Sequence, residues 1–170
     1  SLSNKNKSLI VMAVERKPAK DKNAPGINQS GFVCGSAKAA LVASASSDDL
    51  GKFIHGALEA GANMLTDGWA GYSGSESHVK HEPETQGNPK NAAVLLPTAH
   101  MLISNLKSWL NGTFHGVSKK HLPSYLMEWN YRFNRRNLTS NLFGYAIRRL
   151  MTKEPITYKQ VKSGLSFVQA

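Results

Sequence analysis

Residues 96–136, LPTAHMLISNLKSWLNGTFHGVSKKHLPSYLMEWNYRFNRR, decide the fold that this sequence predicts. Apolar side chains recur along them at steps of three and four residues, which is the spacing of a buried helix face. One helix is predicted over residues 93–110, and Gly112 ends it. A second helix opens at Ser118 and holds Pro123 near its first turn, where the missing amide does least harm. The apolar stripe of the second helix comprises Leu122, Tyr125, Leu126, Trp129 and Phe133.

The sequence before this stretch predicts strands around a helix. Residues 8–16 and 32–44 are short apolar runs typical of buried strands, and residues 63–66 form a brief third strand. Between the second and third strands, Ser46 or Ser47 supplies the N-cap of a helix that ends at Gly61. The chain therefore belongs to the α/β class.

Three further segments complete the prediction. A short strand is expected around residues 78–82, and a third helix covers residues 140–151. The tail after Pro155 is expected to be short and irregular. The C-terminal part of the chain is thus predicted to be helical.

The positive charge of the chain is concentrated in its second half. The 170 residues hold 21 Lys+Arg and 11 Asp+Glu, which gives a formal net charge of +10. Residues 1–90 hold 10 basic and 9 acidic residues, whereas residues 91–170 hold 11 and 2. Clustered cations favour a polyanion such as DNA through counterion release, although a solvated basic face would give the same count. The candidate DNA contacts are Lys119, Lys120, Arg132, Arg135, Arg136, Arg148 and Arg149.

Composition also predicts the compartment. Cys34 is the single cysteine and cannot form an internal disulfide, so a cytoplasmic protein is expected. No apolar run approaches the roughly 18 residues of a membrane span. The N-terminal apolar run stops at Glu15 without a cleavage site, which argues against secretion. The chain starts at Ser1 without an initiator methionine, so we expect it to be a piece of a longer protein.

Asp67 and two residues of the helix predicted over residues 93–110 form a candidate catalytic group. Asp67 follows the third predicted strand, at the sheet edge where ligands gather in α/β proteins, although an Asp-Gly turn would explain it equally. His100 and Lys107 lie only about 20° apart around a helix, so they share a face. Asn105 lies about 200° from Lys107 and points the other way. An Asp facing a metal-binding His and a Lys suits metal-assisted phosphoryl transfer, but His100 could equally be a hydrogen-bonded core residue.

Several phrases in this chain resemble the ISXO2-like insertion-sequence transposase domain. They are SNLKSWLNGTFHGVS (104–118), KHLPSYL (120–126) and YRFNRR (131–136), preceded by Thr66-Asp67-Gly68-Trp69 and Tyr72. The resemblance implies a ribonuclease-H-like fold and the DDE-type cut-and-join chemistry of DNA transposition. It implies Mg²⁺ or Mn²⁺ as cofactor and, as partners, the DNA of transposon ends and target.

The resemblance also assigns roles to individual residues. Asp67 matches the family's second acidic metal ligand, and Lys107 matches the lysine seven residues after the third catalytic position. That third position falls on His100, so the implied metal ligands are Asp67 and His100. Asn105 is the alternative third residue, which the helical-face geometry disfavours.

One departure from the family affects the expected activity. The family's first catalytic Asp lies on an opening strand that precedes residues 8–16, and this chain does not contain that strand. We therefore expect residues 1–158 to be a partial catalytic domain with an incomplete mixed sheet and flanking helices, followed by a tail at 159–170. Alone it would be inactive; a noncatalytic DNA-binding or regulatory remnant is the alternative. The source would be a bacterial, nucleoid-associated protein, and homo-oligomerisation stays open.

Overall fold

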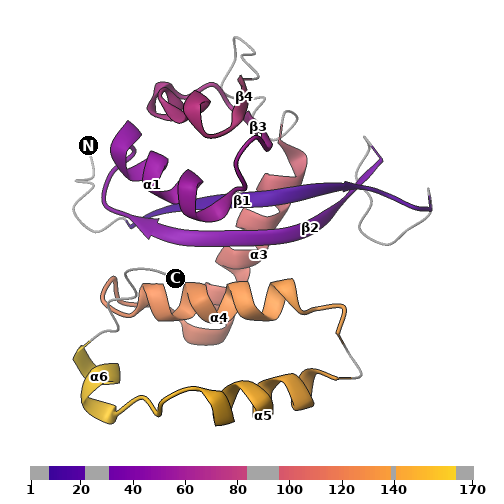
Figure 1. Cartoon of the computed structure of the whole chain (residues 1–170). Coiled ribbons are helices and arrows are strands. Elements are labelled where there is room, and N and C mark those ends of the chain that lie inside the picture. Colours follow the sequence, from indigo (N-terminus) through magenta and orange to yellow (C-terminus); the bar gives the residue numbers. More distant parts are fainter. Residues whose placement is uncertain (1–7, 22–30, 84–95, 139–140, 164–170) are drawn as a thin grey trace.

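The first two strands form a long antiparallel hairpin. The computed structural model describes residues 8–21, 31–83, 96–138 and 141–163. β1 (Leu9–Pro18) pairs with β2 (Phe32–Val42), with an irregularity in register between Val14 and Arg16. Both strands lie where the apolar runs predicted them. Figure 1 shows α1 on one side of this hairpin and α4 on the other.

The hairpin leads into α1 (Ser47–Ala57), whose start follows from local chemistry. The Ser46 hydroxyl accepts a hydrogen bond from the Asp49 amide at 3.4 Å, so Ser46 is the N-cap. The helix buries Leu50 and Ile54 and ends at Ala57, four residues before the predicted end at Gly61. Together with Met64 and Val79, Ile54 forms a small second core.

Two short parallel strands form a separate sheet. β3 (Asn63–Thr66) pairs with β4 (Lys80–Pro83), and the short 3-10 turns η2 (Ala70–Tyr72) and η3 (Ser75–Ser77) lie between them. The mixed α/β class is confirmed. Within the described residues, however, the strands form two two-stranded sheets and not the one incomplete mixed sheet that was expected. Strand periodicity predicts which residues extend but carries no information about which strand each one pairs with.

The main core forms where α3 (Pro97–Phe114) and α4 (Leu122–Asn134) meet the hairpin. The prediction that Gly112 ends the first helix is wrong: α3 continues to Phe114, and His115 caps it in the left-handed region with a φ of 51°. The part of this prediction over residues 93–95 lies outside the described residues. α4 begins at Leu122, so the predicted start at Ser118 is wrong: Ser118 lies in the preceding turn, where its carbonyl accepts from the His121 and Leu122 amides. Pro123 lies in the first turn of α4, as predicted. The buried side chains of this core are Ala37, Ala39, Leu102, Leu106, Leu122, Leu126 and Trp129.

Two asparagines of α4 form hydrogen bonds with backbone groups along the outer edge of β2. The Ala39 amide donates to Asn130 Oδ1, and Asn130 Nδ2 donates back to the Ala39 carbonyl. Asn134 makes the same pair of bonds with Ala37, one turn further along the helix. Exposed strand edges invite pairing with other chains, so these side-chain amides protect the hairpin as an added strand would.

The C-terminal helices lie beyond α4. α5 (Leu142–Thr152) runs alongside α4 in the opposite direction, and α6 (Tyr158–Ser163) follows it (Figure 1). α5 confirms the third predicted helix, whereas the tail predicted to be irregular contains α6. No helix in the described part of the chain is both long and apolar enough to cross a bilayer.

Candidate active site and nucleic-acid interface

Asp67 lies on the surface at the carboxyl end of β3. The preceding Thr66 is buried, and its hydroxyl lies 2.8 Å from His81 Nε2. Gly68 adopts a φ of +74°, which turns the chain sharply after Asp67 and suits glycine because it lacks a Cβ. Asp67 Oδ1 accepts one long hydrogen bond, 3.4 Å, from the Trp69 amide. The carboxylate is exposed, and this is the one hydrogen bond that it accepts from the described residues, so most of its lone pairs are available to a ligand there.

The residues after Asp67 fix the turn against the end of the hairpin. The Trp69 indole donates to the Ala45 carbonyl at 3.3 Å. Gly71 passes so close to the same carbonyl and to the Trp69 ring that a Cβ there would overlap both. Burial, with a smaller contribution from the Asp67 carboxylate, raises the pKa of the Tyr72 hydroxyl. The TDGW phrase and Tyr72 thus form one packed unit that holds Asp67 outward.

His100 and Lys107 lie on the exposed face of α3. Both are exposed, whereas Leu102 and Leu106 on the opposite face are 3% exposed. The interpretation of His100 as a core histidine is wrong, because its side chain is on the surface. The shared face of His100 and Lys107 leaves both groups accessible to a ligand.

Asn105 lies on the side of α3 that meets α4. The Trp129 indole donates a hydrogen bond to Asn105 Oδ1 at 3.4 Å. This contact gives Asn105 a structural partner away from the face of His100 and Lys107. Across the described ranges, no three His, Cys, Asp or Glu side chains are grouped closely enough to hold a metal ion. The pairing of Asp67 with His100 around one cation stays a prediction.

The structure gives the predicted DNA contacts different surroundings. Lys119 and Lys120 are exposed just before α4. Arg132 forms an ion pair with Glu128 at 2.8 Å, one turn away on the same helix. Arg136 donates to the carbonyl oxygens of Cys34, Gly35 and Phe133. Its guanidinium also stacks 4.0 Å from the centre of the Phe133 ring, so Arg136 joins α4 to β2.

The other three arginines gather between α4 and α5. Arg135 lies over the Tyr131 ring at 4.0 Å, and Arg149 lies 5.7 Å from the same ring. Arg148 lines the same space. Sequence reasoning found these arginines but missed Tyr145, which lines the pocket beside them. It also missed Asn130 and Asn134, whose only signal was the four-residue spacing of two asparagines on a helix.

The fold and the exposed Asp67 at a strand end define an α/β protein with a candidate site for ligands or metal ions. Comparison with known families then identifies it: the chain belongs to the family of the ISXO2-like transposase domain, whose model matches residues 1–134. No curated protein and no solved structure gives a significant match. Membership indicates a role in DNA transposition and interaction with DNA. The matched range contains Asp67, His100 and Lys107 and ends just before Arg135.

Proposed function

We propose that this chain is part of a transposase catalytic domain that hydrolyses a phosphodiester at a transposon end and joins the freed 3′ hydroxyl to target DNA. The observation that carries the proposal is the exposed Asp67 at the carboxyl end of β3, inside the range matched by the transposase family. We further propose that its hairpin, parallel pair and flanking helices belong to a ribonuclease-H-like fold. Such a protein would work on the bacterial nucleoid.

Asp67 and His100 are the proposed ligands of Mg²⁺ or Mn²⁺. Asp67 fits this role because its carboxylate accepts only a 3.4 Å hydrogen bond from the residues that the structure describes, which leaves oxygen lone pairs for a hard cation. His100 is exposed and offers an imidazole nitrogen, which suits Mn²⁺ better than Mg²⁺. When bound, a divalent ion would lower the pKa of an attacking water or hydroxyl and neutralise charge on the phosphate.

Lys107 has a separate role in this proposal. It lies two turns after His100 on the same exposed face of α3, so its ammonium group can approach the phosphate beside the scissile bond. A cation at that position stabilises the negative charge that develops on the phosphate oxygens during transfer. Lys107 would position and neutralise DNA without touching the metal ion.

A strand-transfer assay with transposon-end DNA and Mg²⁺ or Mn²⁺ tests this function. The protein should be extended at its N-terminus through the family's opening strand, with the 170-residue chain run in parallel to test whether that strand is required. Asp67→Asn should abolish strand transfer and leave DNA binding within about twofold, since the exposed carboxylate contributes little to the fold. Asp48→Asn, in the first turn of α1, is the matched control and should keep activity.

Two results would contradict the proposal. Full strand transfer by the Asp67→Asn variant would show that Asp67 is not part of the active site. If neither the extended nor the 170-residue protein shows metal-dependent strand transfer while both still bind DNA, the alternative of a noncatalytic DNA-binding remnant is favoured.

A further inference from the structure

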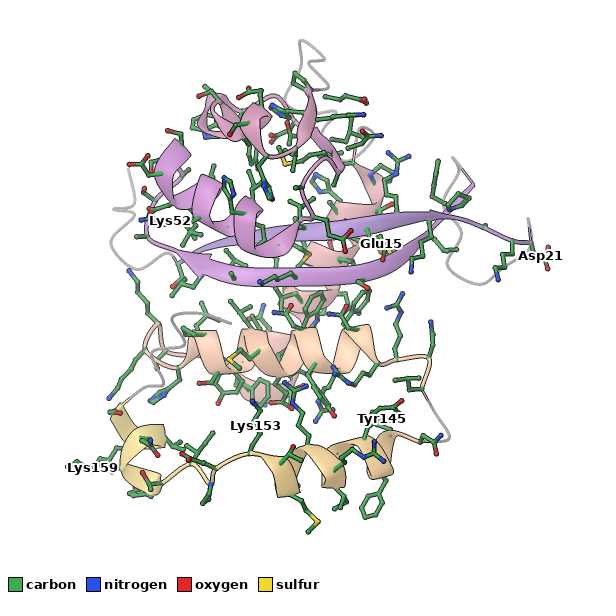
Figure 2. The ribbon with its side chains drawn as sticks, in the orientation of Figure 1. Glu15, Asp21, Lys52, Tyr145, Lys153 and Lys159 are labelled. Atoms are coloured by element: carbon green, nitrogen blue, oxygen red, sulfur yellow. The ribbon has the colours of Figure 1, made fainter. Side chains whose placement is uncertain are left out.

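A pocket between α4 and α5 gathers three arginines and no acidic group. It has a volume of about 210 Å³, many times the roughly 10–15 Å³ that a cavity needs to hold one water. Figure 2 shows Tyr145 on the side of α5 that faces α4. The residues that line it are Tyr131, Arg135, Tyr145, Arg148, Arg149 and Thr152.

The aromatic ring of Tyr131 holds two of these guanidinium groups. Arg135, from the end of α4, lies 4.0 Å from the ring centre, and Arg149, from α5, lies 5.7 Å from it. The attraction between a cation and a ring face stabilises each guanidinium at the pocket wall. Thr152 donates its hydroxyl to the carbonyls of Arg148 and Arg149, so it fixes the end of α5 and is not a donor to a ligand.

The guanidinium groups of the pocket have no carboxylate partner among the described residues. The acidic residue on this part of α4, Glu128, is paired with Arg132. Like charges gathered at one pocket repel each other, because their mutual Coulomb energy is unfavourable at short distance. A bound anion would offset that repulsion, because it attracts each of the three guanidinium groups.

The orientation of α5 supports a ligand between the helices. Three apolar side chains of α5 are largely exposed and not buried against α4: Phe143 is 79% exposed, Leu150 is 72% exposed and Met151 is 84% exposed. A helix held against α4 by the hydrophobic effect would turn this stripe inward. Instead, the face with Tyr145, Arg148 and Arg149 is directed at α4, so polar groups line the space between the two helices.

We propose that this pocket binds a backbone phosphate of duplex DNA, away from the catalytic residues. Guanidinium forks match phosphate oxygens in a bidentate arrangement, and the Tyr131 and Tyr145 hydroxyls can add hydrogen bonds. The proposal rests on the proposed function for its choice of DNA as the source of the phosphate. Five of the six lining residues follow residue 134, so the family match does not assign this site.

DNA binding by the full 170-residue chain tests the pocket, measured by fluorescence anisotropy with a labelled duplex of mixed sequence. Arg148→Gln/Arg149→Gln should weaken binding roughly tenfold and lower the slope of log K against log salt by about 0.9 for each phosphate that is no longer neutralised. Lys159→Gln/Lys162→Gln removes the same charge from α6 and is the control. Figure 2 shows Lys159 pointing away from α4. Equal reductions in affinity in the two double variants would overturn the proposal.

A second pair of variants separates a built pocket from a merely basic surface. Arg148→Lys/Arg149→Lys keeps both charges but removes the planar forks, so affinity should still fall severalfold. Wild-type affinity in this variant would overturn the proposal. Arg135→Gln removes the guanidinium contributed from α4, so its expected reduction in affinity does not depend on whether the variants of α5 keep that helix folded.

The phosphate that binds in the pocket could come from the DNA backbone or from free inorganic phosphate, and a titration with each distinguishes these two sources. Chemical shifts of the arginine side chains, followed by NMR, should move with the duplex at far lower concentration than with free phosphate. Tighter binding of free phosphate than of the duplex would overturn the choice of DNA. If the arginine variants bind DNA like wild type while strand transfer still depends on Asp67, the pocket proposal fails and the proposed function stands. Wild-type protein that does not bind DNA would contradict both the pocket proposal and the proposed function.

Discussion

Asn130 on α4 and Ala39 on β2 bind each other through two hydrogen bonds. The Ala39 amide donates to Asn130 Oδ1 at 2.8 Å, and Asn130 Nδ2 donates to the Ala39 carbonyl at 2.9 Å. Asn134 repeats the arrangement with Ala37 at 2.7 and 2.8 Å. Because residues four apart on a helix and two apart on a strand both lie on one side, the two pairs fit together without distortion. The YRFNRR phrase, through Asn134 and Arg136, therefore serves to attach α4 to the edge of the hairpin.

Removing one of these amides should destabilise the chain strongly. Asn130→Ala leaves the amide and carbonyl of Ala39 without partners at a residue only 3% exposed. Each unsatisfied buried group costs about 1–3 kcal/mol, so we expect a loss of about 2–4 kcal/mol in the free energy of unfolding. Urea unfolding measures it. Asn111→Ala, at an exposed position of α3, should change stability by less than about 0.5 kcal/mol; similar effects at both positions would contradict the role of Asn130.

Neighbouring residues of α4 should respond very differently to truncation. Leu126 is 1% exposed in the main core, and Met127 beside it is 46% exposed. Leu126→Ala should cost about 2–5 kcal/mol, because it loses apolar burial and leaves a cavity. Met127→Ala should stay within about 0.5 kcal/mol of wild type. Thermal or urea unfolding of both variants checks the predicted orientation of the helix, and a smaller cost at position 126 than at 127 would show it to be wrong.

Glu15 should make stability depend on pH in the acid range. The Ser36 amide, which donates to Glu15 Oε2 at 2.9 Å, and the nearby Lys17 ammonium lower the pKa of Glu15 below its usual value of 4.5. A carboxylate with a lowered pKa in the folded state stabilises that state above its unfolded pKa, and the effect disappears as pH falls through the folded pKa. Wild type should therefore be more stable than Glu15→Gln at neutral pH, and the two should converge in acid. A difference that grows as pH falls would contradict this assignment.

Two glycines should give opposite results when replaced by alanine. At Gly71 a Cβ would meet the Ala45 carbonyl and the Trp69 ring, and relieving such an overlap costs about 1–3 kcal/mol. A Cβ added at Gly51, inside α1, would meet no described atom within 4 Å apart from its chain neighbours and the backbone of the helix itself, so alanine should stabilise the helix by about 0.5–1 kcal/mol. The free energies of unfolding of Gly71→Ala and Gly51→Ala, compared with wild type, test both predictions. Equal effects of the same sign would mean that the turn after Asp67 is not packed as described.

The positions of the elements were largely predictable because they depend on local pattern. The apolar spacing of α4 and the Ser46 cap of α1 involve residues within one or two helical turns of each other. The end of α3 was not predictable in the same way. A glycine can end a helix, but at Gly112 the helix continues, and His115 supplies the left-handed cap instead.

The candidate site was predictable only in part. The strand end at Asp67 and the shared face of His100 and Lys107 follow from strand and helix geometry, and in the structure all three side chains are exposed. The engagement of Asn105 by Trp129 was beyond local reasoning, because these residues are 24 positions apart. Coordination of one metal ion by Asp67 and His100 stays a prediction.

The sequence by itself determined the order of the strands and of the helices up to α5, the basic character of the second half and, through its motifs, the resemblance to a transposase family. Each of these depends on neighbouring residues or on composition. Only the tertiary structure decided how the basic residues are used: Arg136 binds the Gly35 carbonyl of β2, 101 positions away, whereas Arg135, Arg148 and Arg149 converge on a pocket. Periodicity along one element cannot specify a contact made across the fold, because that contact depends on which faces of distant elements are brought together.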